Sequence, residues 1–227
     1  MADLGTNFGD VRELDFNANS DKLLVCGNSG DDGYEIWSVP GWSKVKWDYS
    51  YNDDARSCRY ANNDHYAVGS KDGYIRYYNP SYNQVWRNRR DDNSEIEGLA
   101  FSPNSSYLLA TWTADSRKVA IFDVSSNTSE LNLTAPNSDT DAVDWSPDGT
   151  HFAFGNNNKD LFLNDGSSTS TFNTRLEDFT EPSDDVESLE FSYNSQWLVA
   201  GMKNNRALFY RRKCSIDPIG IPQHCPA

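Results

Sequence analysis

TDAVDWSPDGTHFAFG, residues 140–155, is the stretch that decides the fold. It reads as a short apolar strand closed by an aromatic residue, a tight polar turn, and a second apolar strand. Pro, Asp and Gly favour the turn, and the flanking residues are typical strand formers. The pattern recurs along the chain at intervals of 41 to 46 residues. The intervals are measured between the aromatic residues that close the first strand of each copy, namely Phe16, Tyr60, Phe101, Trp145 and Phe191. A repeat of this length organises the whole chain.

Each copy of the pattern continues with a second polar turn and a third apolar strand. The third strands are predicted at 34–37, 74–78, 119–123, 160–163 and 207–210. Linkers at 45–47, 84–86 and 130–133 supply a fourth strand in three of the repeats. A four-stranded meander that is apolar on both faces is stable only when copies pack against one another. The sequence therefore predicts an all-β fold, a β-propeller of about five four-stranded antiparallel blades.

Three pieces of the chain also resemble a known family. Phe101-Ser-Pro-Asn-Ser, Trp145-Ser-Pro-Asp-Gly-Thr and Ile121-Phe-Asp123 are similar to the repeat of WD40 proteins, and the resemblance extends over all five repeats, from about Val11 to Arg211. The Gly-His dipeptide of that repeat is absent and its Trp-Asp pair is degenerate. The resemblance implies a non-enzymatic protein-interaction scaffold, with partners docking on the narrower face of the propeller. It also implies that packing replaces most of the polar network of the family.

Domain organisation is predicted as one propeller over residues 1–213, with repeats starting near 10, 54, 95, 139 and 185, and a Pro/Cys-containing tail over 214–227. WD40 propellers usually have seven blades. A true five-bladed ring, a ring closed by an oligomeric partner and an incomplete chain all remain open. If the ring closes, residues 2–8 are candidates to pair with 207–210.

Composition restricts the classes of partner. The chain has 34 acidic and 20 basic residues, a formal net charge of −14. Such a surface repels phosphate backbones and anionic headgroups, which disfavours nucleic-acid and membrane-surface binding. No apolar run is long enough for a transmembrane helix, and the first residues do not resemble an export signal. We expect a cytoplasmic protein; a secreted five-bladed glycoprotein, carbohydrate-binding or structural, is the alternative.

Acidic residues recur just before every innermost strand, at Asp10, Asp54, Glu95, Asp139 and Asp185. Further charged residues lie two positions on, at Arg12, Arg56, Glu97, Asp141 and Glu187. Radial symmetry predicts that these side chains surround one mouth of the central channel. Two interpretations remain open: the acids stabilise turns, or they form a rim that binds a protein or peptide, plausibly a basic one.

Other chemistry has little support in the sequence. No hydrolase, metalloprotease or phosphate-loop motif occurs, so no catalytic residues, cofactor or metal are predicted. Cys26 and Cys58 lie in apolar strands, where a small core residue is the usual role. Cys214 and Cys225 flank the tail as a candidate disulfide; with His224 they match no zinc-binding spacing.

Overall fold

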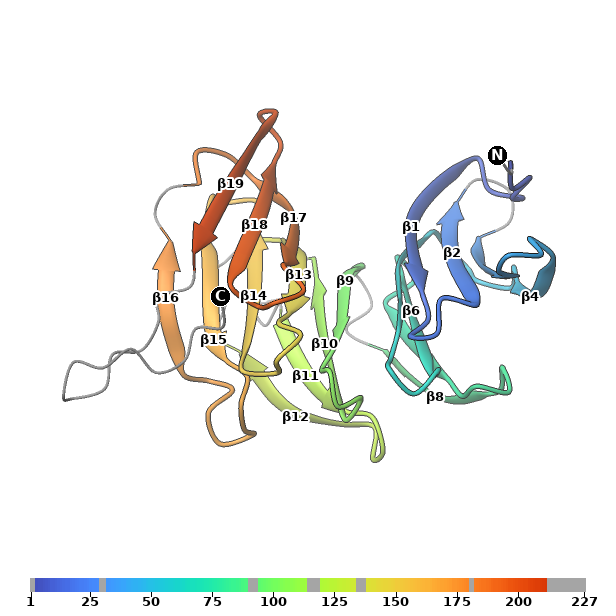
Figure 1. Ribbon diagram of the computed structural model, residues 1–227, viewed down its shortest axis with the longest axis horizontal. Coiled ribbons are helices and arrows are strands. Elements are labelled where there is room, and N and C mark those ends of the chain that lie inside the picture. Colours follow the sequence, from blue (N-terminus) through green and yellow to red (C-terminus); the bar gives the residue numbers. More distant parts are fainter. Residues whose placement is uncertain are drawn as a thin grey trace.

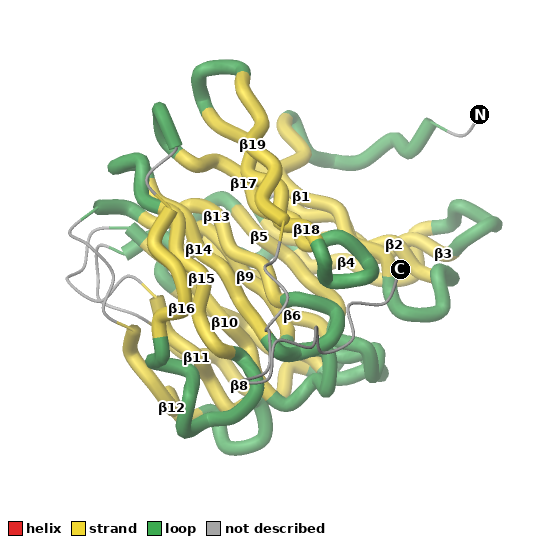
Figure 2. Tube along the Cα trace, turned by 60° about the vertical axis from the view of Figure 1, so that its left-hand side comes forward, coloured by secondary structure: helices red, strands yellow, loops and turns green. Residues whose placement is uncertain are grey.

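The computed structural model describes residues 3–28, 32–89, 94–113, 119–133, 138–179 and 182–211, and the secondary structure of this part is strands joined by turns (Figure 2). The strands form five antiparallel sheets, numbered 1 to 5 along the chain. Sheet 1 contains β1 (Asp10–Phe16), β2 (Lys22–Asn28), β3 (Gly33–Ser38) and β4 (Lys44–Asp48). Sheet 2 contains β5 (Ala55–Tyr60), β6 (Tyr66–Ser70), β7 (Tyr74–Tyr78) and β8 (Gln84–Arg89). Sheet 3 contains β9 (Ile96–Phe101), β10 (Tyr107–Trp112), β11 (Val119–Asp123) and β12 (Thr128–Leu133). Sheet 4 contains β13 (Thr140–Trp145), β14 (His151–Asn156), β15 (Leu161–Asp165) and β16 (Arg175–Phe179), and sheet 5 contains β17 (Val186–Phe191), β18 (Trp197–Met202) and β19 (Arg206–Arg211).

The first turn of every sheet has one backbone geometry, which confirms the repeat at the level of single hydrogen bonds. In each turn the amide of the fourth residue donates to the carbonyl of the first, as in Gly149 to Ser146 at 2.8 Å. That fourth residue has a positive φ in all five sheets, at Ser20, Asp64, Ser105, Gly149 and Ser195. Only Gly149 takes this left-handed conformation without steric cost. The turn is therefore imposed by the strand pairing on either side of it.

The hydrophobic core lies between the sheets. Each sheet has a leading face, directed at the preceding sheet, and a trailing face, directed at the following one. Between sheets 1 and 2, for example, Leu24 and Ile36 from the trailing face of sheet 1 pack on Cys58, Tyr60 and Tyr66 from the leading face of sheet 2. Equivalent clusters lie between sheets 2 and 3, 3 and 4, and 4 and 5. This stacking confirms that packing between neighbouring sheets stabilises the fold.

The described residues do not show a closed ring, a question that the sequence leaves open. The innermost strands β1, β5, β9, β13 and β17 each pack on the next, but no comparable packing joins β17 to β1. The sheets at the two ends of the chain lie on opposite sides of the view in Figure 1. Sheet 5 has three strands in the described part of the chain, not four. We call the space between sheet 5 and sheet 1 the open seam.

The N-terminal segment does not act as a closure strand for sheet 5. Leu4 and Phe8 pack instead on the leading face of sheet 1, against Leu23, Val25 and Trp37. The expected pairing of residues 2–8 with 207–210 is therefore wrong for the described residues. The physical reason is that the apolar surface of sheet 1 is formed by residues that follow soon after this segment in the chain. Covering that surface buries apolar area and costs little loop-closure entropy.

A buried charged network ties the same segment to sheet 1. The Glu35 side chain is fully buried, and its Oε1 accepts hydrogen bonds from Lys44 Nζ at 2.7 Å and from the Asn7 amide at 3.0 Å. Tyr49 Oη donates to the same oxygen at 2.5 Å, and Trp37 Nε1 donates to Oε2 at 2.8 Å. Burial alone raises the pKa of Glu35, but these donors outweigh it, so the pKa is lowered and the group is held as a carboxylate.

Cys26 and Cys58 are buried core residues between sheets 1 and 2, as predicted, and both are free thiols. Burial raises the pKa of each thiol, which keeps both protonated and unreactive. Cys214 and Cys225 lie outside the described residues, as does the rest of the tail over 214–227. No helix in the described part of the chain is long and apolar enough to cross a membrane.

Candidate functional site: the mouth of the central channel

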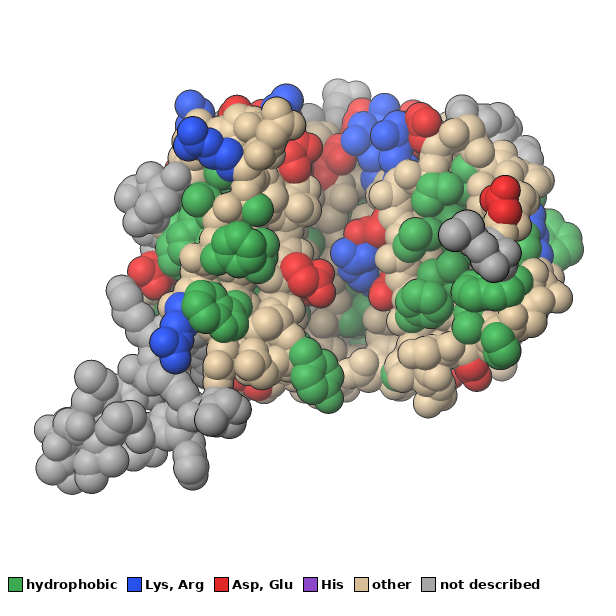
Figure 3. Space-filling model, turned by 45° about the horizontal axis from the view of Figure 1, so that its top comes forward, with side chains coloured by type: hydrophobic (Ala, Val, Ile, Leu, Met, Phe, Trp, Pro, Cys, Tyr) green, Lys and Arg blue, Asp and Glu red, His purple; other side chains and the backbone are tan. Residues whose placement is uncertain are grey.

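The five innermost strands surround a shared cavity of about 810 Å³. Residues from β1, β5, β9, β13 and β17 all line it, so it is the channel mouth that radial symmetry predicts. Acidic and basic side chains gather in the hollow between the two lobes of the molecule (Figure 3). The cavity is hydrophilic, which suits a charged or peptide ligand better than an apolar small molecule.

The ten charged residues singled out in the sequence lie around this mouth, but not as a uniform ring. Those that line the cavity are Arg12, Arg56, Glu95, Glu97, Asp139, Asp141 and Glu187. Asp10, Asp54 and Asp185 are not among the lining residues. The Oδ2 atom of Asp54 lies 3.8 Å from Arg12 Nη2 and 3.6 Å from Lys71 Nζ. The Oδ2 atom of Asp185 accepts a hydrogen bond from Lys203 Nζ at 3.1 Å. The two sets of positions therefore differ in role, because the second set points further into the channel.

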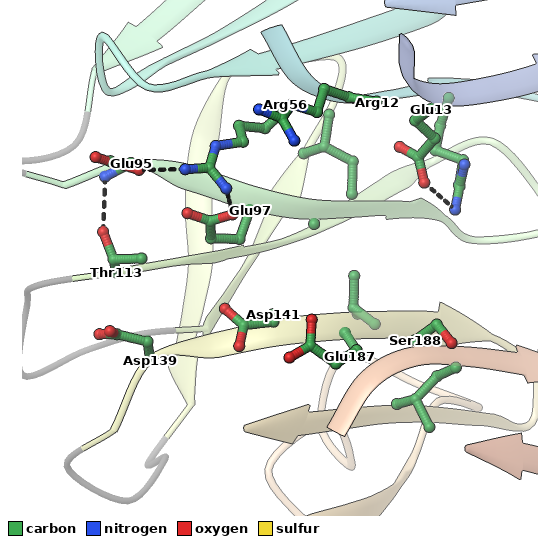
Figure 4. Close-up of a pocket in the computed structure, with 16 residues that line it drawn as sticks. Arg12, Glu13, Arg56, Glu95, Glu97, Thr113, Asp139, Asp141, Glu187 and Ser188 are labelled. Atoms are coloured by element: carbon green, nitrogen blue, oxygen red, sulfur yellow. Dashed lines mark hydrogen bonds and ion pairs between the residues drawn. The ribbon is translucent and has the colours of Figure 1, made fainter. Parts of the chain in front are cut away.

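One half of the mouth is neutralised by ion pairs. Arg56 on β5 reaches across to sheet 3, where Nη2 lies 2.9 Å from Glu95 and Nη1 lies 3.0 Å from Glu97 (Figure 4). Burial raises the pKa of Glu97 to about 7; Arg56 opposes the shift and the nearby carboxylates of Asp141 and Glu95 add to it. Arg12 and Arg56 thus screen the carboxylates around them.

The other half is an acidic sector, which we define as Asp139, Asp141 and Glu187. These residues come from β13 and β17 and from the turn before β13, and Asp141 and Glu187 lie close together in Figure 4. Within the described chain, no lysine or arginine lies within ion-pair distance of Asp141 or Glu187. Burial, together with the charges of Glu187, Asp139 and Asp185, raises the pKa of Asp141 to about 6. Like charges held together in this way attract a cation.

Deeper in the channel lies a second charged group that the sequence reasoning missed. It is made of Glu13, Asp15, Arg59, Asp144 and Glu190, which line a second cavity of about 860 Å³. Arg59 Nη2 lies 2.6 Å from Glu13. A signal was present in the sequence, since the residue just before the closing aromatic is charged in four of the five repeats, at Asp15, Arg59, Asp144 and Glu190.

Two of these acids join neighbouring sheets. Asp15 accepts a hydrogen bond from the Tyr60 amide at 2.7 Å, and Asp144 accepts one from the Phe191 amide at 2.6 Å. In both cases the carboxylate of one innermost strand satisfies the free edge amide of the next. Burial raises the pKa of Asp15 to about 6 and that of Asp144 to about 7, against the lowering effect of these amides.

We expect the protein to be more stable at pH 5 than at pH 8, with a melting temperature higher by about 5 °C or more. Asp15, Glu97, Asp141 and Asp144 all have raised pKa values, so each contributes stability that is complete below its unfolded pKa near 4 and is lost as pH rises through 6 to 7. Melting temperatures measured from pH 4.5 to 8.5 test this. A Glu97→Gln/Asp141→Asn variant should show a smaller pH effect, and stability that is flat or rises over this range would contradict the expectation.

The site carries no arrangement that indicates catalysis or metal binding in the described residues. No group of three or more His, Cys, Asp or Glu side chains there is placed to hold a metal ion. The residues that line the cavity include no histidine or cysteine, and their hydroxyl groups are those of Thr113 and Ser188. What this geometry offers is charge and shape for recognition.

Comparison with known families gives one match. Residues 173–211, which contain β16 and all of sheet 5, match the family WD domain, G-beta repeat (WD40). The chain carries a WD40 repeat. This match supports the WD40-repeat family from a part of the chain that does not include Phe101, Ile121 or Trp145. WD40 domains typically bind proteins. A search of curated proteins finds no match to the chain.

Proposed function

We propose that this WD40-repeat chain is a non-enzymatic interaction scaffold that docks a basic segment of a protein partner at the acidic sector of its channel mouth. The observation that carries the proposal is the charge asymmetry of the mouth. Arg56 pairs with Glu95 and Glu97, whereas Asp141 and Glu187 face the cavity with no cation from the described residues paired to them. A lysine or arginine from a partner supplies the missing charge and relieves the repulsion among these acids.

Burial of the site strengthens the attraction. Asp141 lies on a strand at the cavity wall, where lower polarity makes each ion pair stronger than on an open surface. The site is thus suited to a lysine- or arginine-containing peptide, and the net charge of −14 guides such a partner toward it.

The test uses a fluorescent peptide of alternating lysine and glycine, with binding followed by anisotropy. We expect an Asp141→Asn/Glu187→Gln variant to bind at least about tenfold more weakly, because both changes remove charge while keeping side-chain shape. A matched control, Asp48→Asn/Asp123→Asn, removes the same charge from the ends of β4 and β11 and should change binding far less. Equal loss in both variants would show that only net charge matters and would overturn the proposal.

The pH dependence of binding gives a second readout. Because the pKa of Asp141 is raised to about 6, peptide affinity should increase as pH rises from 5 to 8, opposite in sign to the stability. The increase should be smaller in the Asp141→Asn variant. An affinity independent of pH in the parent protein would argue against docking at this sector.

A further inference from the structure

The leading face of sheet 1 is exposed at positions that are buried in the other sheets. Val11, Leu14 and Phe16 on β1 are 46%, 54% and 49% exposed. The residues equivalent to Val11 and Leu14 in sheets 2 to 5 are all buried: Ala55, Ile96, Thr140 and Val186, and Cys58, Leu99, Val143 and Leu189. Those equivalent to Phe16, namely Tyr60, Phe101, Trp145 and Phe191, are buried or partly buried. The β1 part of this face is therefore uncovered, whereas Leu4 and Phe8 cover its β2 and β3 part at Leu23, Val25 and Trp37.

The trailing face of sheet 5 also has an exposed position of this kind. Phe209 on β19 is 68% exposed. Its register equivalents Ile36, Tyr77 and Ile121 are buried and Leu163 is partly buried, each in a cluster with the following sheet. Phe209 thus leaves apolar surface on the trailing face of sheet 5 that the described chain does not cover.

The polar groups at the two faces are complementary as well. Asp15 and Asp144 each accept the edge amide of the next innermost strand, at Tyr60 and Phe191. At the open seam, the position of the acceptor carboxylate is occupied by Glu190 on β17, and the position of the donor amide by Phe16 on β1. Within the described chain neither group makes a carboxylate–amide hydrogen bond of this kind. The trailing face of sheet 5 thus carries the acceptor, and the leading face of sheet 1 carries the donor.

The charges follow the same rule. Arg56 and Glu97 occupy one repeat position in neighbouring sheets and form an ion pair at 3.0 Å. At the seam that position is occupied by Glu187 in sheet 5 and Arg12 in sheet 1, which are again of opposite sign. The other neighbouring pairs at this position, such as Asp141 and Glu187, are of like charge.

We propose that the open seam is an interface between copies of this chain, in which sheet 5 of one copy packs through its trailing face on the leading face of sheet 1 of another. A second copy is the occupant because the exposed parts of the two faces belong to the two sides of a single repeated interface and match in apolar, hydrogen-bonding and charged groups. Within one chain they do not pack on each other. The contact is heterologous, so it joins copies in series and leaves one face free at each end.

Mass measurements across a concentration series test the interface on the full chain. The parent protein should move from monomer to dimer and longer species as concentration rises. High salt should promote this, because it screens the repulsion between chains that each carry a net charge of −14. A monomer at all concentrations and salt levels would overturn the proposal.

Two variants assign the contact to its faces. Leu14→Glu/Phe16→Glu disables the leading face of sheet 1, and Phe209→Glu disables the trailing face of sheet 5. Each alone should weaken association by at least about tenfold, because every contact between identical copies then contains one altered face. Val85→Glu on β8, where Val85 is 53% exposed and remote from the seam, is the matched control and should leave association unchanged.

Mixing the two variants gives the decisive measurement. Each retains the face that the other lacks, so the mixture should form a dimer of one copy of each and nothing larger. Circular dichroism and melting curves check that both variants fold, as expected for substitutions at half-exposed positions. Association that survives both variants, or a mixture that stays monomeric, would place the contact elsewhere and overturn the proposal.

Discussion

Lys44→Met is expected to lower the free energy of unfolding by about 3–5 kcal/mol. The substitution leaves the Glu35 carboxylate fully buried without its cation, with only the neutral donors of Asn7, Trp37 and Tyr49. A buried charge without a counter-ion is among the largest single sources of instability in a protein. Chemical denaturation at pH 7 measures the effect.

The control for this prediction is Lys46→Met, which makes the same chemical change two residues along β4 and is expected to cost less than about 1 kcal/mol. Adding Glu35→Gln to Lys44→Met should restore part of the loss, because the buried group is then neutral. The deficit should also shrink as pH falls through the lowered pKa of Glu35, where the carboxylate takes up a proton. If Lys44→Met and Lys46→Met cost the same, the network does not stabilise the fold.

Phe172→Ala is expected to lower the free energy of unfolding by about 3–5 kcal/mol. Phe172 lies between β15 and β16, outside any strand, yet it is almost completely buried. Its ring meets those of Tyr107, Trp145 and Phe152 edge-on, with centroids 5.1, 5.5 and 6.2 Å away. Removing it leaves a cavity where sheets 3 and 4 meet, and three aromatic rings lose a contact.

Tyr193→Ala provides the control, because Tyr193 is 95% exposed and its removal should change stability by about 0.5 kcal/mol or less. Phe172→Leu fills most of the volume and should cost less than the alanine substitution. A Phe172→Ala protein as stable as the parent would mean that the segment between β15 and β16 does not contribute to the core.

The contrast between Phe172 and the strands shows how far sequence reasoning reached. The strands around Trp145 were predicted to within a residue or two, because local alternation and turn residues specify them. Phe172 stands in a run of Ser, Thr and Asn with no periodicity, so nothing local marks it as buried. The β16 strand was missed for the same reason. Both depend on contacts with residues far away in the chain.

The candidate site divides in the same way. The recurrence of acids before each innermost strand placed Glu95 and Asp139 at the channel mouth, and the charged residues two positions on also line it. Sequence spacing did not predict that Arg56 neutralises one half while Asp141 and Glu187 in the other half have no ion pair within the described part of the chain. That asymmetry depends on which side chains reach across to the next sheet.

By itself the sequence determined the repeat, the all-β class, the order of strands within each sheet and the position of the charged residues at the channel. These follow from alternation of apolar residues and from turn chemistry, which act over a few residues. Only the tertiary structure decided that the Leu4–Phe8 segment covers sheet 1, that sheet 5 has three described strands, and that β1 and β17 do not pack together. Closure of a ring depends on the angle between successive sheets, because small differences in that angle add up over the whole chain. The angle itself is set by how the side chains of neighbouring sheets pack.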